Sequence, residues 1–263
     1  MNFIKTHEPE NVIVLLSGGS SALIEKSADG KAAAEINEML LKSGLPITEI
    51  NKKRGEYSLI KNGKLAEMFK KTAFYVFAAS DIPFDGGEKA VGSMPFFRED
   101  LENTHLFKCA DSDSLHDELL KLLPENTESF RRFTGSVDEL QTLLLSRIEA
   151  GAEALLVTGE PLLKITSKNT GTGGRMSHFA LSMLPFLKNG MKLWALSSDG
   201  IDGNSPFAGA IVGSSPEIPE NEVPAALESY NSAELLDRYG LTVKSGYTGL
   251  NLNDFVVFLR KDL

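Results

Sequence analysis

The stretch NVIVLLSGGSSAL, residues 11–23, indicates the fold class because it joins an apolar strand directly to a loop of small residues that opens onto a helical segment. Further apolar runs of strand length lie at residues 73–79, 154–158, 192–197 and 255–259. Segments with helical periodicity separate these runs, and strands that alternate with helices are typical of an α/β architecture. We therefore predict an α/β fold with a mostly parallel sheet that helices cover.

Two domains are expected from the way this pattern is interrupted. Residues 124–136 are polar and irregular, and residues 151–161 restart with a new strand. Domain boundaries commonly fall in such irregular, polar segments. We therefore expect one domain over residues 1–150 and a second over residues 151–263. The predicted helices cover residues 31–43, 63–71, 112–123, 137–151 and 176–187.

The composition restricts the classes of partner. The chain of 263 residues has a net charge of −9, and nucleic acids and anionic membranes repel acidic proteins. No apolar run approaches the roughly 20 residues that a membrane helix needs, and residues 1–10 are too polar for a secretory signal. We therefore expect a cytoplasmic protein with no nucleic-acid or membrane partner, although a few local cations could still hold a small anionic substrate. The sequence leaves a homo-oligomer open.

The single cysteine, Cys109, lies in a mixed stretch at residues 105–110 that is expected to form a strand. One cysteine excludes an internal disulfide and a cysteine-based zinc site, which fits a reducing compartment. Buried structural cysteines are commoner than reactive ones. We therefore expect Cys109 to belong to the core.

The loop of residues 17–22 has the features of an anion site. A helix that follows a glycine-rich turn directs unpaired backbone N–H groups and the positive end of its dipole outward. Neither the Walker spacing nor the Gly-x-Gly-x-x-Gly fingerprint is present. A tight turn without a ligand is the alternative.

The same loop also satisfies Gly-x-Ser-x-Ala, with Gly18, Ser20 and Ala22. This pattern resembles the nucleophile elbow of α/β-hydrolases and opens a second class of function, a serine hydrolase that uses Ser20. Such an enzyme needs an acid and then a histidine later in the chain. His105, His116 and His178 are the candidates.

Two further loops carry charged side chains next to glycines. Arg175 is expected in the first turn of a helix, where a cation opposes the helix dipole, so an anionic partner would explain it. Asp199 and Asp202 directly follow a predicted strand and are placed to hold Mg²⁺ or to orient a hydroxyl group. The alternatives are a surface arginine for the first loop and a plain double turn for the second.

A fourth loop, residues 245–254, gathers hydroxyl, amide and carboxylate side chains around two glycines. Such a cluster can bind several oxygens of a small polar ligand. In their order along the chain, the four loops resemble those of the glycerate 2-kinase family. Members of that family carry a Ser-Gly-Gly-Gly-Ser-Ala-Leu loop, an Asn-x-x-Arg-Lys-His-x-Ser-x-Ile-Lys-Gly-Gly segment and MOFRL motifs. The matching positions include Ser17 to Leu23, Asn51, Arg54, Ser58, Lys61, Gly63, Ser80 to Pro83, Gly173 to Arg175, Asp199 to Gly203 and Thr248 to Asp254.

The resemblance implies a truncated, Rossmann-like N-terminal domain and a MOFRL-type C-terminal domain. It also implies transfer of the γ-phosphoryl group of ATP to the 2-hydroxyl of D-glycerate, or of a similar hydroxy acid, with Mg²⁺ in a cleft between the two domains. Phosphoryl transfer needs cations that spread the migrating charge and carboxylates that hold a metal.

The resemblance also suggests a role for individual residues. Lys61 and Arg175 would stabilise charge, Asp81 would hold the glycerate hydroxyl or the metal, and Asp199 with Asp202 would hold Mg²⁺ or the nucleotide. Substrate and phosphate would be bound by Ser17, Gly18, Gly19, Ser20, Ser21, Asn51, Arg54, Thr248, Asn251, Asn253 and Asp254.

This sequence departs from the family pattern in ways that favour an alternative function. Gly55 and Glu56 replace the family's Lys-His pair, which should weaken anion binding, and Asn62 replaces a glycine. The family segment upstream of the first loop, with its Gly-Lys-Ala motif, has no counterpart before residue 17. The alternative is therefore a non-catalytic homologue that binds a nucleotide or a metabolite.

Overall fold

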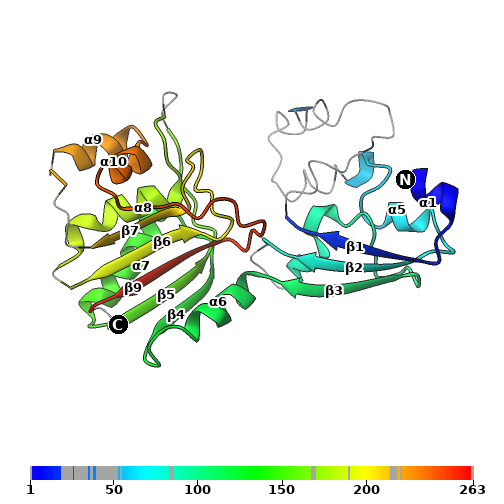
Figure 1. Ribbon diagram of the computed structural model, residues 1–263, viewed down its shortest axis with the longest axis horizontal. Coiled ribbons are helices and arrows are strands. Elements are labelled where there is room, and N and C mark those ends of the chain that lie inside the picture. Colours follow the sequence, from blue (N-terminus) through cyan, green and yellow to red (C-terminus); the bar gives the residue numbers. More distant parts are fainter. Residues whose placement is uncertain are drawn as a thin grey trace. The chain divides into compact units, whose positions relative to one another are not determined.

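A computed structural model of the chain describes two compact units, Met1–Cys109 and Ala110–Leu263 (Figure 1). No helix among the described residues is both long and apolar enough to cross a membrane. The described residues are 2–18, 26, 35, 38–39, 53, 55–82, 86–166, 170–188, 190–213, 218–219 and 221–261.

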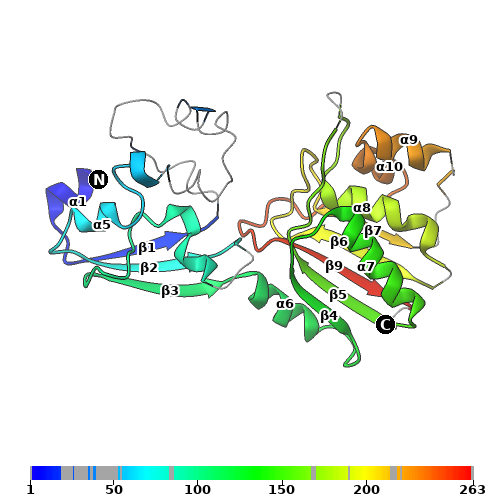
Figure 2. The same ribbon diagram turned by 180° about the vertical axis from the view of Figure 1, so that it is seen from behind.

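The first unit is built on a three-stranded sheet of order β1-β2-β3. The strands are β1 (Asn11–Leu16), β2 (Ala73–Ala79) and β3 (Thr104–Ala110). β1 and β2 pair in parallel, from Asn11 opposite Ala73 to Leu16 opposite Ala78. The short helices α1 (Asn2–His7) and α5 (Lys64–Glu67) lie over the same face of this sheet (Figures 1 and 2). Two 3-10 turns, η1 (Gly87–Lys89) and η2 (Val91–Ser93), follow β2.

The core of the first unit lies on the face that α1 and α5 cover. Side chains of a strand alternate between the two faces of a sheet, and in β2 Phe74, Val76 and Ala78 are buried. They pack with Leu16 from β1 and Ala66 from α5. The alternation in AFYVFAA therefore fixes which face of the sheet is packed.

The second unit contains a six-stranded sheet of order β4-β5-β9-β6-β7-β8. Helix α6 packs on one face through Leu119 and Leu120, whereas α7 and α8 pack on the other (Figure 2). The strands are β4 (Glu128–Phe133), β5 (Ala154–Gly159), β6 (Lys192–Ser197), β7 (Gly209–Gly213), β8 (Thr242–Val243) and β9 (Asp254–Leu259). The helices are α6 (Ser112–Leu120), α7 (Val137–Glu149), α8 (Arg175–Met183), α9 (Glu222–Glu228) and α10 (Ser232–Arg238), with the 3-10 turn η3 (Leu184–Phe186) after α8.

The predicted α/β class is confirmed, but the second sheet is mixed and not mostly parallel. β4 and β5 are parallel, whereas β9 lies antiparallel between β5 and β6, and β7 lies antiparallel beside β6. An apolar run such as DFVVFL predicts a buried strand but not its direction. The expectation of parallel strands therefore holds for β1 and β2 and is wrong for most of the second sheet.

The division between the two units lies earlier than the boundary near residue 150 that we expected. β4 pairs with β5, with Glu128 opposite Leu155, and α7 packs on the same sheet. Residues 110–150 therefore belong to the second unit by their contacts. The sequence ESFRRF of β4 contains two arginines and only partial alternation, so it was not recognised as a strand.

The expectation that Cys109 is buried is wrong, because its side chain is exposed. β3 is the edge strand of the first sheet, and Cys109 follows His105 and Phe107 on the face opposite the core. That face has little cover among the described residues. Most of the predicted helix at 31–43 lies outside the described residues, and α5 is shorter than the predicted 63–71.

His116 is a buried titratable side chain on α6. Its Nδ1 atom is 2.8 Å from the hydroxyl of Thr158 on β5, and its Nε2 has no partner among the described residues. Burial favours the neutral ring, and the nearby charge of Arg131 adds to this, so the pKa of His116 is lowered to about 4.

The free energy of unfolding should therefore fall as the pH is lowered through the window between the ordinary histidine pKa and about 4. In this window His116 binds a proton in the unfolded chain but stays neutral in the folded protein. The free energy of unfolding therefore falls by up to about 3 kcal/mol. His116→Gln removes this part of the pH dependence. Urea unfolding across the window measures it, with His7→Gln, an exposed histidine, as the matched control. An unchanged slope in His116→Gln contradicts the prediction.

Candidate functional site

A cavity of about 430 Å³ lies at one edge of the sheet in the second unit. β5 and β6 end at this edge, and because β9 runs antiparallel to both, its first residue lies there too. Asp254 is opposite Gly159 of β5 and opposite Ser197 of β6. Three segments that are distant in sequence therefore bring polar groups to one place.

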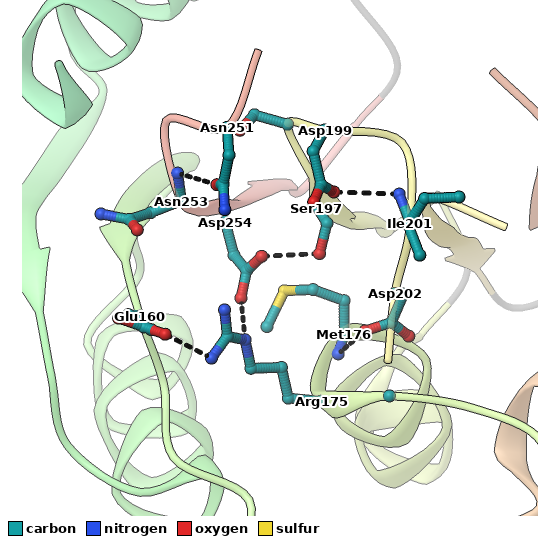
Figure 3. Close-up of polar contacts among 12 residues, drawn as sticks. Glu160, Arg175, Met176, Ser197, Asp199, Ile201, Asp202, Asn251, Asn253 and Asp254 are labelled. Atoms are coloured by element: carbon teal, nitrogen blue, oxygen red, sulfur yellow. Dashed lines mark hydrogen bonds and ion pairs between the residues drawn. The ribbon is translucent and has the colours of Figure 1, made fainter. Parts of the chain in front are cut away.

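Arg175, the first residue of α8, is the centre of an ion-pair network in this cavity (Figure 3). Its Nε donates to Asp254 Oδ2, and its Nη1 lies 3.0 Å from Glu160 Oε1. The hydroxyl of Ser197 donates to Asp254 Oδ1 at 2.6 Å. Arg175 is thus paired with two carboxylates of the protein. Within the described residues Nη2 donates no hydrogen bond, so it remains available to a ligand.

Burial and charge act in opposite directions on this network. Burial raises the pKa of Asp254 to about 6, although the Arg175 charge and the Ser197 hydroxyl oppose the rise. Burial also acts to lower the pKa of Arg175, but Asp254 and Glu160 outweigh it, so that pKa lies above its ordinary value. Arg175 therefore stays charged, and Asp254 ionises only near neutral pH.

Asp202 is buried and caps the N-terminus of α8. Its Oδ1 accepts from the backbone N–H of Met176 at 2.9 Å, and its Oδ2 accepts from that of Ser177 at 2.7 Å. The negative charge also complements the helix dipole. Burial raises the pKa of Asp202, while these hydrogen bonds act to lower it. A Cβ at Gly174 would overlap Oδ1, so the close approach of Asp202 requires glycine there.

The backbone amides of the preceding glycine loop are also satisfied within the protein. Gly171 donates to the carbonyl of Ser229 at 2.8 Å, and Thr172 donates to Asn231 Oδ1 at 2.7 Å. Gly173 donates to Asn204 Oδ1 at 2.8 Å. The loop is therefore a fixed wall of the cavity and not an open cradle for an anion.

Asp199 lines the cavity and is less engaged than Asp202. Its Oδ1 accepts from the backbone N–H of Ile201 at 3.0 Å, and its Oδ2 has no partner among the described residues. Gly200, with φ +85°, permits this turn, because a Cβ there would overlap the carbonyl oxygen of Gly246. Of the two aspartates that we predicted as metal ligands, Asp199 is the one with a carboxylate oxygen left for a ligand.

The segment before β9 divides into lining and supporting residues. Asn251 lines the cavity, and its Oδ1 accepts from the N–H of Asn253 at 2.9 Å. Thr248 donates to the carbonyl of Ser198 at 2.7 Å, which holds the segment against the loop after β6. Asn253 is buried with φ +72°, and its Nδ2 has no partner among the described residues. Asn251 and Asp254 therefore face the cavity, while Thr248 and Asn253 shape the backbone.

The other end of the cavity is aromatic and apolar. His178, three residues after Arg175 on α8, stacks on Tyr230 with ring centroids 5.5 Å apart. Burial lowers the pKa of His178, so its ring is neutral at neutral pH. Leu162 and Ile165 line the same end. Sequence reasoning considered His178 only for a hydrolase and missed Tyr230, Asn204 and Asn231, whose partners are far away in sequence.

The first unit brings together two of its predicted site residues. A Cβ at Gly18 would overlap the carboxylate of Asp81, so Gly18, which follows β1, and Asp81, which follows β2, lie in contact. Lys61 is buried, and its backbone N–H donates to Ser58 Oγ at 3.1 Å. Ser17 is also described. The predicted binding residues that lie outside the described residues are Gly19, Ser20, Ser21, Asn51 and Arg54.

The histidines proposed for a hydrolase have separate environments. His105 stacks on Tyr75 in the first sheet, His116 is buried beside Thr158, and His178 lines the cavity of the second unit. Ser20 lies outside the described residues. The part of the chain that the structure describes holds no group of three or more His, Cys, Asp or Glu side chains placed to bind a metal ion.

Asp202→Asn should destabilise the protein by about 1–3 kcal/mol, because the amide nitrogen of asparagine cannot accept from the backbone N–H groups of α8. Urea unfolding measures the loss. The matched control is Asp199→Asn, which keeps an acceptor for Ile201 and should change stability by less than about 0.5 kcal/mol. Equal stability of the two variants contradicts the capping role.

The carboxyl of Asp254 should titrate near pH 6, and Arg175→Gln should raise its pKa further, because the positive charge that favours the ionised form is lost. Ser197→Ala should raise it by a smaller amount. Carboxyl ¹³C NMR of labelled protein follows the titration. Since the folded protein binds this proton more readily than the unfolded chain, protonation of Asp254 adds to stability as the pH falls through about 6. A pKa that Arg175→Gln leaves unchanged would falsify the coupling.

Comparison with known proteins relates both units to one group of enzymes. Residues 1–123 match the family model described as a domain of unknown function, DUF4147, and residues 153–254 match the MOFRL family. The glycerate 2-kinase of Sulfurisphaera tokodaii is 32% identical over 98% of this chain and 73% of its own length. The D-glycerate 2-kinase of Thermotoga maritima is 27% identical over 96% and 73%.

A structural match supports the same relationship. The crystal structure of the glycerate kinase from Thermotoga maritima superposes with a TM-score of 0.81 at 25% identity. The match covers 95% of this chain and 72% of that structure. The residues 153–254 that match the MOFRL family include Arg175, Asp199 and Asp254 of the cavity. The chain therefore belongs to the glycerate 2-kinase family and carries a C-terminal MOFRL region.

Proposed function

We propose that this protein transfers the γ-phosphoryl group of ATP to the 2-hydroxyl of D-glycerate in the presence of Mg²⁺. Relatives that match nearly the whole chain are named glycerate 2-kinases, which supports the reaction class. The structural observation that carries the proposal is the cavity of the second unit, where a fixed arginine lies among carboxylates. Transfer of a phosphoryl group depends mainly on positioning and on charge stabilisation of this kind.

The charge balance of the cavity favours a metal-bound phosphate over a free anion. Arg175 is paired with Asp254 and Glu160, and Asp199 adds a further carboxylate. Oxygen ligands suit Mg²⁺, which commonly takes one or two protein carboxylates together with phosphate oxygens and water. Asp199 Oδ2, which accepts no hydrogen bond within the described part of the chain, fits this requirement. When bound, Mg²⁺ supplies neutralisation of the charge on the phosphates.

The two ends of the cavity suit the two parts of a nucleotide. Tyr230, His178 and Ile165 offer a flat, apolar surface against which a base can stack. At the other end, Arg175 Nη2 and Asn251 can donate to phosphate oxygens. We therefore assign the nucleotide to this cavity, with Arg175 as the residue that stabilises the migrating charge.

Residues of the first unit are assigned to glycerate. Asp81 lies against Gly18, and it is proposed to orient the acceptor hydroxyl. Lys61 is proposed to stabilise the charge of the transferred group, as the family resemblance implies. Ser20, Asn51 and Arg54 are proposed to contact the carboxylate or phosphate groups.

The wild-type protein should form 2-phosphoglycerate only when ATP, Mg²⁺ and D-glycerate are all present, as followed by ³¹P NMR. Asp199→Asn should lower kcat by about 10²-fold or more, because it removes a carboxylate ligand of the metal. Arg175→Lys should lower kcat by a similar factor, because lysine cannot replace the planar guanidinium group. Asp199→Asn should also raise the Mg²⁺ concentration needed for half-maximal rate.

Glu125→Gln, at an exposed position outside the cavity, serves as the matched control and should keep the wild-type rate. Absence of product from the folded wild-type protein, with ATP still bound in calorimetry, would favour the non-catalytic alternative. A wild-type rate in Asp199→Asn would show that Asp199 is not a ligand of the metal.

A further inference from the structure

Three buried polar atoms of the second unit have no hydrogen-bond partner among the described residues. They are Oγ of Ser112 and Nε2 of His116, both on α6, and Nδ2 of Asn253, the residue before β9. None of these three residues is more than 2% exposed. A buried polar group without a partner is costly, and native proteins keep very few of them. The three atoms therefore indicate a small polar ligand.

The contacts of α6 place Ser112 beside the end of β5. His116 Nδ1 is 2.8 Å from the hydroxyl of Thr158, whereas Leu120 packs on the apolar cluster that contains Leu156, earlier in the strand. The helix therefore runs antiparallel to β5. Residues four apart lie on the same face of a helix, one turn from each other. Ser112 thus lies on the same face as His116 and one turn closer to the end of β5.

Asn253 reaches the same end of β5 from the other direction along the chain. Asp254 is opposite Gly159, the last residue of β5, and Asn253 directly precedes Asp254. In Figure 3 the side chain of Asn253 points away from Arg175 and from the Asp254 carboxylate, and it does not line the cavity. Phe255, two residues further, packs on the face of the sheet that α6 covers. We therefore place the Asn253 amide on this face, level with Ser112.

We propose that Ser112, His116 and Asn253 together bind one buried water molecule between α6 and the start of β9. None of the three atoms hydrogen-bonds to another, so a small molecule can bridge them. A buried water typically makes about three hydrogen bonds to polar groups that lack other partners. Water accepts from the amide of Asn253, and it can donate to or accept from a hydroxyl and either tautomer of a neutral imidazole.

The charges around this site favour water over an ion. Arg131 and Arg132 of β4 are paired with Asp117 and Asp113 of α6. The carboxylate of Asp111 accepts from the first turn of the same helix. The imidazole is neutral at neutral pH, and the amide nitrogen at the site is a donor that repels a cation. With the nearby charges balanced, neither a cation nor an anion is favoured over water.

The water site has a consequence for the cavity on the other face of the sheet. Asn253 has φ +72° and directly precedes Asp254, whose carboxylate binds Arg175. A hydrogen bond that fixes the amide of Asn253 also fixes the backbone from which Asp254 extends. Ser112 and His116 are therefore positioning residues for Asp254, although neither lines the cavity.

A crystal structure of the full chain tests the site directly. We expect one electron-density peak within hydrogen-bond distance of Ser112 Oγ, His116 Nε2 and Asn253 Nδ2, without anomalous signal after a bromide soak. Three outcomes overturn the proposal. They are the absence of a peak, side chains that pair directly with one another, and bromide at the site, which would identify an anion.

Stability measurements test whether the three groups share one ligand. Ser112→Ala should raise the equilibrium constant of unfolding in urea about fivefold, because the water loses a partner. Removal of a hydroxyl that had no partner would instead leave stability unchanged or increased. Ser146→Ala, at an exposed position on α7, is the matched control and should stay close to the wild type.

A double-mutant cycle adds Asn253→Gly, since glycine tolerates the positive φ of this position. The effects of Ser112→Ala and Asn253→Gly should not be additive, because each variant disturbs the same water. Additive effects, or a Ser112→Ala variant as stable as the wild type, overturn the shared site.

Hydrogen exchange tests the positioning role separately from stability. The Nε–H group of Arg175 donates to Asp254, so its proton is protected from exchange. In Ser112→Ala this proton should exchange with solvent about tenfold faster, as measured by ¹⁵N NMR in the absence of denaturant. Ser146→Ala should exchange at the wild-type rate. An unchanged rate in Ser112→Ala overturns the positioning role. None of these measurements needs substrate, so they are independent of the kinase proposal.

Discussion

The hydrogen bonds from the first turn of α8 to the buried carboxylate of Asp202 are the constraint on which the cavity depends. A buried charge is costly unless polar groups compensate it, and here two backbone amides and the helix dipole do so. Arg175 directly precedes the amides that Asp202 binds. The position of Arg175, and with it the pairing to Asp254 and Glu160, therefore follows from a residue that lies more than twenty residues further along the chain.

The hydrophobic pattern of the sequence predicted most of the fold, but it did not predict the relative direction of the strands. The runs at β2 and β6 are apolar or alternating along their whole length, so their bounds were correct from sequence. β9 is equally apolar, but nothing in DFVVFL states whether its neighbours run with it or against it. β4 was missed because an edge strand with two arginines lacks the apolar signal of a central one.

Candidate site residues could be identified from the sequence where they lie next to a glycine turn. Their roles could not be predicted where these depend on contacts between distant segments. Arg175 at the start of a helix, Asp199 after a strand and Asp254 before a strand all line one cavity. The two aspartates after β6 looked equivalent in sequence, yet one caps a helix and the other faces the cavity. Only the fold distinguishes them, since the amides that bind Asp202 are more than twenty residues away.

The central place of β9 has a consequence for biosynthesis. β9 is the last described strand of the second unit along the chain, yet it lies between β5 and β6 and pairs with both. While the ribosome is still translating residues 254–259, β4 and β5 cannot join β6 and β7 in one sheet. Pairings between distant segments form slowly and leave strand edges exposed in the meantime. The second unit can therefore complete its sheet only once residues 254–259 have left the ribosome, and until then the edges of β5 and β6 that β9 will occupy stay unpaired.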